Sequence, residues 1–320
     1  MKLSSKIFVA GHSGLVGSAI MRKLKQRGYE NILTSNYADL NLLKQNEVEQ
    51  YFKENHPDYV IDAAAKVGGI MANNTYRGQF IYENLMIQNN LIHSAHIFGT
   101  KKFLFLGSSC IYPKNAAQPL KEEYLLTDTL EETNEPYAIA KIAGIKMCEN
   151  YYKQYGDNFI SVMPTNLYGF NDNFDLKNSH VLPAFIRKFH EAKINRSPSV
   201  EIWGSGKPMR EFLHVDDMAD ACIYIMENVD AENLYENLLV SHINIGTGED
   251  ISIKDLALLV SKIVGFDGEL SYDKSKPDGM LKKQLDVSRL NDMGWFPKIP
   301  LAEGISSTYE WFLNSDKIRK

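Results

Sequence analysis

A glycine-rich turn near the N-terminus constrains the fold more than any other stretch. The apolar run Ile7–Ala10 leads into Gly11–Gly17 (GHSGLVG), and an amphipathic segment follows from about Ser18 to Arg27. This order is typical of a buried strand, a tight turn and a helix. Glycines three apart at such a turn let a pyrophosphate approach the amides that begin the helix. The alternative is a tight turn that binds no ligand.

The first half of the chain alternates between strand and helix patterns. Apolar runs predict strands at 31–35, 59–65, 102–106 and 159–163, and helices are predicted at 45–55, 80–98 and 137–155. Such alternation specifies a parallel sheet with helices on both faces. We therefore expect an α/β fold with a Rossmann-type doubly wound parallel sheet.

The pattern changes after residue 169. We expect loops at 171–179 and 274–279, helices at 181–193, 218–228, 253–264 and 301–312, and strands at 200–203 and 243–245. Asp216 and Asp217, just before one of these helices, are interpreted as its N-terminal cap. The mixed, shorter elements predict a smaller mixed α/β lobe.

Charge and cysteine content exclude several classes of protein. A net charge of −5 provides no basic field for nucleic acid or an anionic membrane. The three cysteines are widely separated, which argues against a disulfide framework and fits a reducing compartment. No apolar stretch approaches the ~18 residues of a membrane span, and the first apolar run is too short for a signal peptide. We expect a cytoplasmic protein without a metal site.

Two residues one helical turn apart form a candidate catalytic pair. Tyr137 and Lys141 follow Pro136, which is tolerated at the first helical position. Side chains four apart share one face of a helix, so the phenol and the ammonium can reach one site. A nearby cation lowers the pKa of a phenol and prepares it for proton transfer. A chance surface pair is the alternative.

Further polar residues follow the strands at 31–35 and 102–106. Ligands of doubly wound sheets lie beyond the carboxyl ends of the strands, where Ser108 and Cys110 stand. Two apart in extended chain, they would point to the same side. Cys110 could instead be a small buried apolar residue. No acid directly follows the earlier strand, which favours NADP over NAD. Asp39-Leu40 could lie near the adenine or cap the helix at 45–55.

Five blocks carry a resemblance to a known family. They are AAAKVGGI at 63–70, GSSCIYP at 107–113, NEPYAIAK at 134–141, MPTNLYG at 163–169 and MREFLHVDD at 209–217. Together with the glycine turn, they resemble the GDP-L-fucose synthase family of extended short-chain dehydrogenase/reductases. That family performs NADPH-dependent 3,5-epimerisation and 4-reduction of GDP-4-keto-6-deoxy-D-mannose. Related dehydratases usually carry an Asp-Glu pair where Cys110-Ile111 stands, so dehydration is not expected.

The resemblance implies a role for each catalytic candidate. Cys110 and His180 would exchange protons at C3 and C5, although His180 could merely cap or pack a helix. Ser108 and Tyr137 would hydrogen-bond the C4 oxygen and stabilise an enolate. Tyr137 would supply the proton during reduction, while Lys141 would bind the nicotinamide ribose and lower the pKa of Tyr137.

The resemblance also implies two sets of binding residues. For NADP(H) these are Gly11, His12, Ser13, Gly14, Leu15, Val16, Gly17, Asp39, Leu40, Leu106, Gly107, Ser108, Ser109, Lys141, Pro164, Thr165, Asn166, Leu167 and His180. For the GDP-sugar they are Asn166, Arg187, Trp203, Arg210, Asp278 and Lys283. The arginines and Lys283 would neutralise the diphosphate, and Trp203 would contact the guanine. Arg187 could equally lie on a solvated helix face. Family arginines associated with the 2′-phosphate are absent at Ser13 and at Asn36 or Tyr37.

These expectations define an organisation and leave alternatives. We expect an NADP-binding Rossmann domain at 1–168, completed by about 212–247, and a substrate-binding lobe at 169–211 and 248–320. A homodimer is expected through the helices at 80–98 and 137–155, with Ala140, Ala143 and Gly144 as a flat packing face. One alternative is a C4 reductase with little or no epimerisation on a related GDP-4-keto sugar such as a 6-deoxy-heptose. Another is a non-catalytic NADP-binding module.

Overall fold

The computed structural model describes residues 1–176, 179–276, 278 and 280–315. The expected loops at 171–179 and 274–279, and the end of the expected lobe at 248–320, thus lie partly outside the described residues. Within this part of the chain, no helix is both long and apolar enough to cross a membrane.

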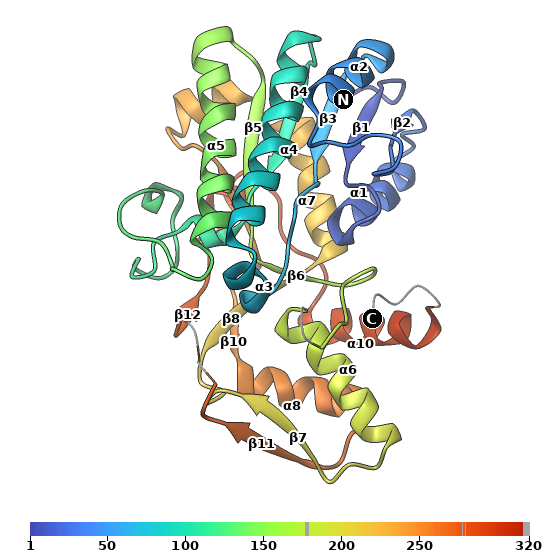
Figure 1. Ribbon diagram of the computed structural model, residues 1–320, viewed down its shortest axis with the longest axis vertical. Coiled ribbons are helices and arrows are strands. Elements are labelled where there is room, and N and C mark those ends of the chain that lie inside the picture. Colours follow the sequence, from blue (N-terminus) through green and yellow to red (C-terminus); the bar gives the residue numbers. More distant parts are fainter. Residues whose placement is uncertain (177–178, 277, 279, 316–320) are drawn as a thin grey trace.

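A six-stranded parallel sheet forms the upper part of the molecule in Figure 1. Its order is β2 (Ile32–Leu33), β1 (Ile7–Ala10), β3 (Tyr59–Asp62), β4 (Lys102–Leu106), β5 (Phe159–Pro164) and β9 (Ile243–Ile245). The register aligns Ala10, Asp62 and Phe105 across three neighbouring strands. The Rossmann-type doubly wound sheet predicted from the sequence is confirmed.

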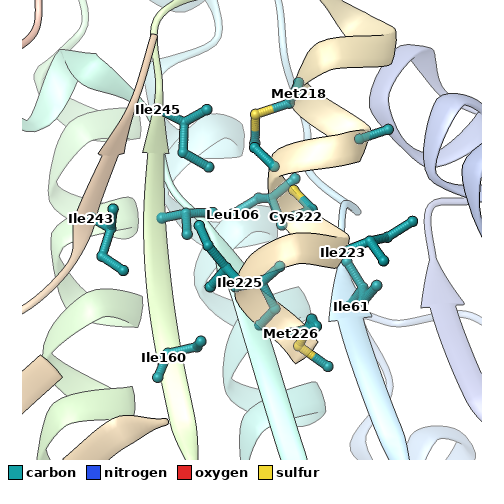
Figure 2. Packing of buried hydrophobic residues seen from close by; sticks show 14 of the residues in the cluster. Ile61, Leu106, Ile160, Met218, Cys222, Ile223, Ile225, Met226, Ile243 and Ile245 are labelled. Atoms are coloured by element: carbon teal, nitrogen blue, oxygen red, sulfur yellow. The ribbon is translucent and has the colours of Figure 1, made fainter. Parts of the chain in front are cut away.

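Helices cover both faces of this sheet. Helices α1 (Leu15–Gln26) and α7 (Val215–Asn228) pack on one face, and α2 (Gln45–Asn55), α4 (Arg77–Ile97) and α5 (Glu135–Tyr155) pack on the other. Figure 2 shows Met218, Cys222 and Ile225 of α7 in the first of these cores. Burial of such side chains is the main favourable term in folding, so both layers hold the strand ends in place.

A second lobe lies beyond the carboxyl ends of the strands (Figure 1). One small sheet contains β6 (Asn166–Tyr168), β8 (Met209–His214), β10 (Asp250–Ser252) and β12 (Lys282–Lys283), and a parallel pair contains β7 (Ser199–Trp203) and β11 (Glu269–Asp273). Helices α6 (Val181–Ile194), α8 (Ile253–Val264) and α10 (Leu301–Asn314) surround a third core. The expected smaller mixed lobe is confirmed, while its exact limits stay a prediction.

Short elements connect these parts. They are α3 (Ile70–Thr75), η1 (Ser109–Ile111), η2 (Glu122–Tyr124), η3 (Asn233–Asn237) and α9 (Ser288–Asp292). The largest departure from expectation is β8, which the sequence patterns did not predict. Helix α7 also begins at Val215 rather than 218, because His214 is its N-cap and accepts a hydrogen bond from the Asp216 amide. The interpretation of Asp216 and Asp217 as the cap is therefore wrong.

The packing of α5 corrects the predicted dimer face. Ala140 is fully buried, and the Gln88 amide of α4 donates to its carbonyl. Gly144 faces the sheet, because a Cβ there would lie 2.4 Å from the Phe105 ring. Ala140 and Gly144 thus serve packing within the chain and do not provide a surface for a partner. The homodimer itself stays a prediction.

Candidate active site

The glycine turn after β1 has the geometry of an anion-binding site. Gly11 has φ +76°, which favours glycine, and a Cβ on it would lie 2.7 Å from the Ala63 carbonyl oxygen. A Cβ on Gly17 would lie 2.1 Å from the Gly11 carbonyl oxygen. Gly14 is the N-cap of α1, whose first turn contains no acidic residue. Backbone N–H groups at this helix start can therefore receive a pyrophosphate.

The other predicted cofactor residues lie at neighbouring strand ends. Residues 106–109 span the end of β4 and the start of η1, and 164–167 span the end of β5 and the start of β6. Asn166 is fixed by an Nδ2 bond to the Glu211 carbonyl at 2.8 Å. Asp39 lies in a turn closed on the Asn36 carbonyl, and Lys44 rather than Asp39 is the N-cap of α2. The capping alternative for Asp39 is therefore wrong.

Tyr137 and Lys141 come together at the start of α5. Lys141 is 3% exposed, and its Nζ donates to the Leu106 carbonyl at 2.8 Å. The same Nζ lies 5.8 Å from the centroid of the Tyr137 ring. Phe80 packs edge-on against that ring, with the centroids 6.3 Å apart. Packing and the Leu106 hydrogen bond therefore hold the pair at the carboxyl ends of the strands, which we call the sheet edge. The alternative of a chance surface pair is wrong.

The electrostatic prediction for Tyr137 is wrong for this structure. Burial, Cys110 and Asp62 raise the pKa of Tyr137 well above its ordinary value of 10.0. Burial also lowers the pKa of Lys141, with Asp62 and Cys110 acting against it. The phenol is therefore held protonated, which suits a proton donor rather than a resting phenolate.

Ser108 and Cys110 approach each other for a reason that the sequence did not indicate. The segment after Ser108 is a turn of 3₁₀ helix, so the expectation of an extended chain is wrong. Ser108 Oγ caps this turn and accepts a hydrogen bond from the Cys110 amide at 3.4 Å. Burial raises the pKa of Cys110, whereas Lys283 and the Ser108 hydrogen bond lower it. Cys110 is half-buried, unlike the fully buried Cys148 and Cys222.

Lys283 links Cys110 electrostatically to His180. It lies on β12 opposite Arg210 of β8, within electrostatic range of both groups. His180 is the N-cap of α6 but makes no side-chain capping bond. Desolvation by the surrounding protein lowers the pKa of His180, and the charge of Lys283 lowers it further. The His180 side chain is nevertheless exposed to solvent. Near neutral pH, a thiol and a neutral imidazole therefore lie within electrostatic range of one half-buried lysine, Lys283.

The predicted nucleotide contacts divide into two groups. Trp203 is 51% exposed, and two ammonium groups lie over its ring, Lys188 at 5.3 Å and Lys276 at 5.6 Å from the centroid. Arg187 points elsewhere, since its Nε donates to Glu191 at 2.7 Å and its Nη1 to the Phe174 carbonyl at 3.1 Å. The structure favours Lys188 over Arg187 as the cation of α6 beside Trp203.

Asp278 and Arg210 have partners inside the chain. Asp278 accepts hydrogen bonds from the amide and the hydroxyl of Ser205, at 2.6 and 2.7 Å. Arg210 donates to the Met209 carbonyl and lies within electrostatic range of Asp278. The Asp278 carboxylate thus stabilises the turn after β7 through hydrogen bonds within the chain.

Three residues beside the site escaped sequence reasoning: Lys188, Glu211 and Asp62. Glu211 is fully buried and accepts backbone hydrogen bonds from Thr247, Gly248 and Leu285. It therefore fixes the loop that carries β12. Asp62 was predicted only as part of a strand, although an acid in such an apolar run is itself a signal.

These features define a dinucleotide-dependent enzyme of the epimerase and dehydrogenase class, with a tyrosine–lysine pair at the sheet edge. A sequence model described as "NAD dependent epimerase/dehydratase family" matches residues 7–246, and the chain belongs to that family.

Individual relatives make the family assignment more specific. The chain is 56% identical over 312 residues to GDP-L-fucose synthase 1 of Arabidopsis thaliana, covering 98% of this chain and 94% of that protein. It is 56% identical over 317 residues to the GDP-L-fucose synthase of Escherichia coli (strain K12), covering 98% of each. A solved GDP-mannoheptose C4 reductase from Campylobacter jejuni, with NADP bound, has a TM-score of 0.89 and 43% identity over 98% of this chain and 100% of that one. The resemblance stated from the sequence blocks is confirmed.

Proposed function

We propose that this protein is an NADPH-dependent epimerase/reductase that converts GDP-4-keto-6-deoxy-D-mannose to GDP-L-fucose. The observation that carries the proposal is the meeting of two chemical groups at one sheet edge. Tyr137 and Lys141 supply a reductase site, and the Ser108–Cys110 turn adds a thiol beside it. Identity of 56% to GDP-L-fucose synthases over 98% of the chain supports the same reaction.

The first stage inverts C3 and C5 of the sugar. The C4 ketone acidifies the protons on both carbons, so a base can remove one and leave an enolate. Cys110 and His180 together hold one transferable proton and one acceptor, because the pKa of the thiol is raised and that of the imidazole is lowered. One group takes the proton and the other returns a proton to the opposite face. Ser108 and Tyr137 hydrogen-bond the C4 oxygen, where negative charge develops.

The second stage reduces the C4 ketone. Bound NADPH supplies the hydride. Tyr137 donates the proton to the C4 oxygen, because its raised pKa keeps the phenol protonated until that step. The Nζ of Lys141 donates to the Leu106 carbonyl. Its remaining N–H groups would be available to the cofactor ribose and to the phenol.

Binding of both nucleotides follows from the same surfaces. The Gly11–Gly17 turn and the strand ends at 106–109 and 164–167 would hold NADPH, and Asp39 and Leu40 would contact its adenine. For the substrate, Trp203 receives the guanine, while Lys188 and Arg210 neutralise the diphosphate. Lys283 was expected to neutralise the diphosphate. Because it lies within electrostatic range of Cys110, it acts on the sugar end of the substrate instead.

Turnover in D₂O tests the proposal. Purified protein, GDP-4-keto-6-deoxy-D-mannose and NADPH should give GDP-L-fucose carrying two non-exchangeable deuterium atoms, at C3 and C5, by mass spectrometry. NADPH oxidation without these deuterium atoms would reject the epimerase part. Absence of NADPH oxidation with any GDP-4-keto sugar would reject the whole proposal and favour a non-catalytic NADP-binding module.

A second candidate is a C4 reductase acting on a GDP-4-keto-heptose with little or no epimerisation. The observation in its favour is the 0.89 TM-score to a GDP-mannoheptose C4 reductase that has NADP bound. The two candidates share Tyr137, Lys141 and Ser108, so the deuterium count separates them directly.

A further inference from the structure

Asp62 is a buried acid at the carboxyl end of β3 that the proposed mechanism does not use. It is 1% exposed and lies in register with Ala10 and Phe105 on the neighbouring strands. Its Oδ1 accepts the Ala64 amide at 3.0 Å, but its buried Oδ2 has no hydrogen-bond partner in the described part of the chain. Burying such an oxygen costs free energy, so its presence calls for a compensating role.

Asp62 shares its surroundings with Lys141. Side chains alternate along a strand, and Val60, two residues earlier, belongs to the core beneath α4 and α5. Lys141 enters the same region from α5, with its Nζ 4.6 Å from the centroid of Phe105. Phe105 is also the cross-strand neighbour of Asp62. The carboxylate and the ammonium are thus brought together beneath the catalytic edge.

The charges in this region favour one protonation state. The charge of Asp62 raises the pKa of Lys141 and so opposes the effect of burial, which lowers it. The same charge helps to raise the pKa of Tyr137. Cys110, from the turn after β4, is the other titratable group that acts on both, and Lys283 of β12 acts on Cys110. Burial raises the pKa of Asp62 to about 6, so the acid is ionised at neutral and alkaline pH.

We propose that Asp62 is a positioning residue for the Tyr137–Lys141 pair. Its carboxylate is the buried counter-charge that keeps Lys141 an ammonium and Tyr137 a protonated phenol. The proton donor is thereby loaded when the C4 oxygen needs a proton. The catalytic part of this inference rests on the proposed function, whereas the electrostatic part rests on the burial of Asp62, on its register beside Phe105 and on the approach of Lys141 to that ring.

Removing the carboxylate acts on both groups in the same direction. In Asp62→Asn, the pKa values of Lys141 and of Tyr137 both fall, because each loses a negative neighbour that favours its protonated form. We expect the alkaline limb of the hydride-transfer rate to move to lower pH by about one pH unit. Below pH 7, both groups remain protonated and the rate stays close to that of the wild type.

The electrostatic part can be tested without substrate. NMR of protein containing ¹³Cε-labelled lysine, with Lys141→Arg for assignment, follows the titration of Lys141. Its midpoint should fall in Asp62→Asn and stay unchanged in Asp58→Asn. The control acid precedes β3 at its other end and pairs with Lys101 at 2.7 Å. An unchanged Lys141 midpoint in Asp62→Asn would overturn the proposal.

The catalytic part is tested by single-turnover NADPH oxidation with GDP-4-keto-6-deoxy-D-mannose across pH 6 to 10. An alkaline limb displaced in Asp62→Asn but not in Asp58→Asn supports the positioning role. A rate lowered equally at every pH, with the limb unmoved, indicates a purely structural role and overturns it. If the wild-type protein reduces no GDP-4-keto sugar, the proposed function fails, and the lysine titration still decides the role of Asp62.

Discussion

The edge of the parallel sheet and the second lobe are built in different ways. At the edge, functional residues follow directly after buried strands, as Ser108 and Cys110 follow β4, so the backbone alone brings them together. In the second lobe, Trp203, Lys188 and Lys276 come from β7, α6 and the loop after β11. In the proposed function, the reacting groups therefore lie where the local order of the chain fixes their positions, and the groups that would bind the nucleotide sugar lie where tertiary packing fixes them.

The largest effect is expected at the sheet edge. Tyr137→Phe removes the proton donor, and reduction should fall by about a hundredfold or more. Its affinity for NADPH should hold within about tenfold, ~1.4 kcal/mol, since the Lys141 anchor on the Leu106 carbonyl remains. Stopped-flow NADPH oxidation and a fluorescence titration measure the two quantities. Loss of cofactor binding with unchanged chemistry would reverse the assignment.

A smaller effect is expected in the second lobe. Lys188→Ala should raise the KM for the GDP-sugar by about tenfold with kcat little changed, because a cation beside Trp203 is lost. Arg187→Ala is the matched control, since its guanidinium is bonded to Glu191 and Phe174. A larger rise in KM for Arg187→Ala than for Lys188→Ala would restore the original sequence-based prediction.

Ionisation of the buried Asp62 carboxyl group should lower the stability of the folded protein as the pH rises. The pKa of Asp62 is raised from 3.8 to about 6 by burial, so the folded state binds more protons between these values. Wild-type stability therefore falls as pH rises through this window, and the loss is complete above about pH 6.

Asp62→Asn should accordingly be more stable than the wild type at pH 8, by up to about 3 kcal/mol, and similar to it near pH 4. Urea unfolding at the two pH values measures the difference. A variant equally destabilised at both pH values would show that the carboxylate has no desolvation cost.

The same contrast explains what the sequence could predict. The bounds of β1, α2, β4 and β9 agree with the patterns, because local apolar runs and turn residues define them. The choice between Arg187 and Lys188 was beyond reach, since adjacent helix positions differ by about 100° and only packing against β7 decides which one faces Trp203. The direction of the Tyr137 pKa shift does not follow from its spacing to Lys141, because burial, which raises this pKa, depends on tertiary packing.

In the proposed mechanism, separate residues at the carboxyl ends of the strands perform proton exchange and reduction. Cys110→Ser turned over in D₂O with GDP-4-keto-6-deoxy-D-mannose and NADPH tests it most directly, with the wild type alongside. We predict that the variant still oxidises NADPH but gives a reduced sugar without deuterium at C3 and C5, whereas the wild-type product carries both. A variant product that carries deuterium at both C3 and C5 would show that proton exchange does not need Cys110.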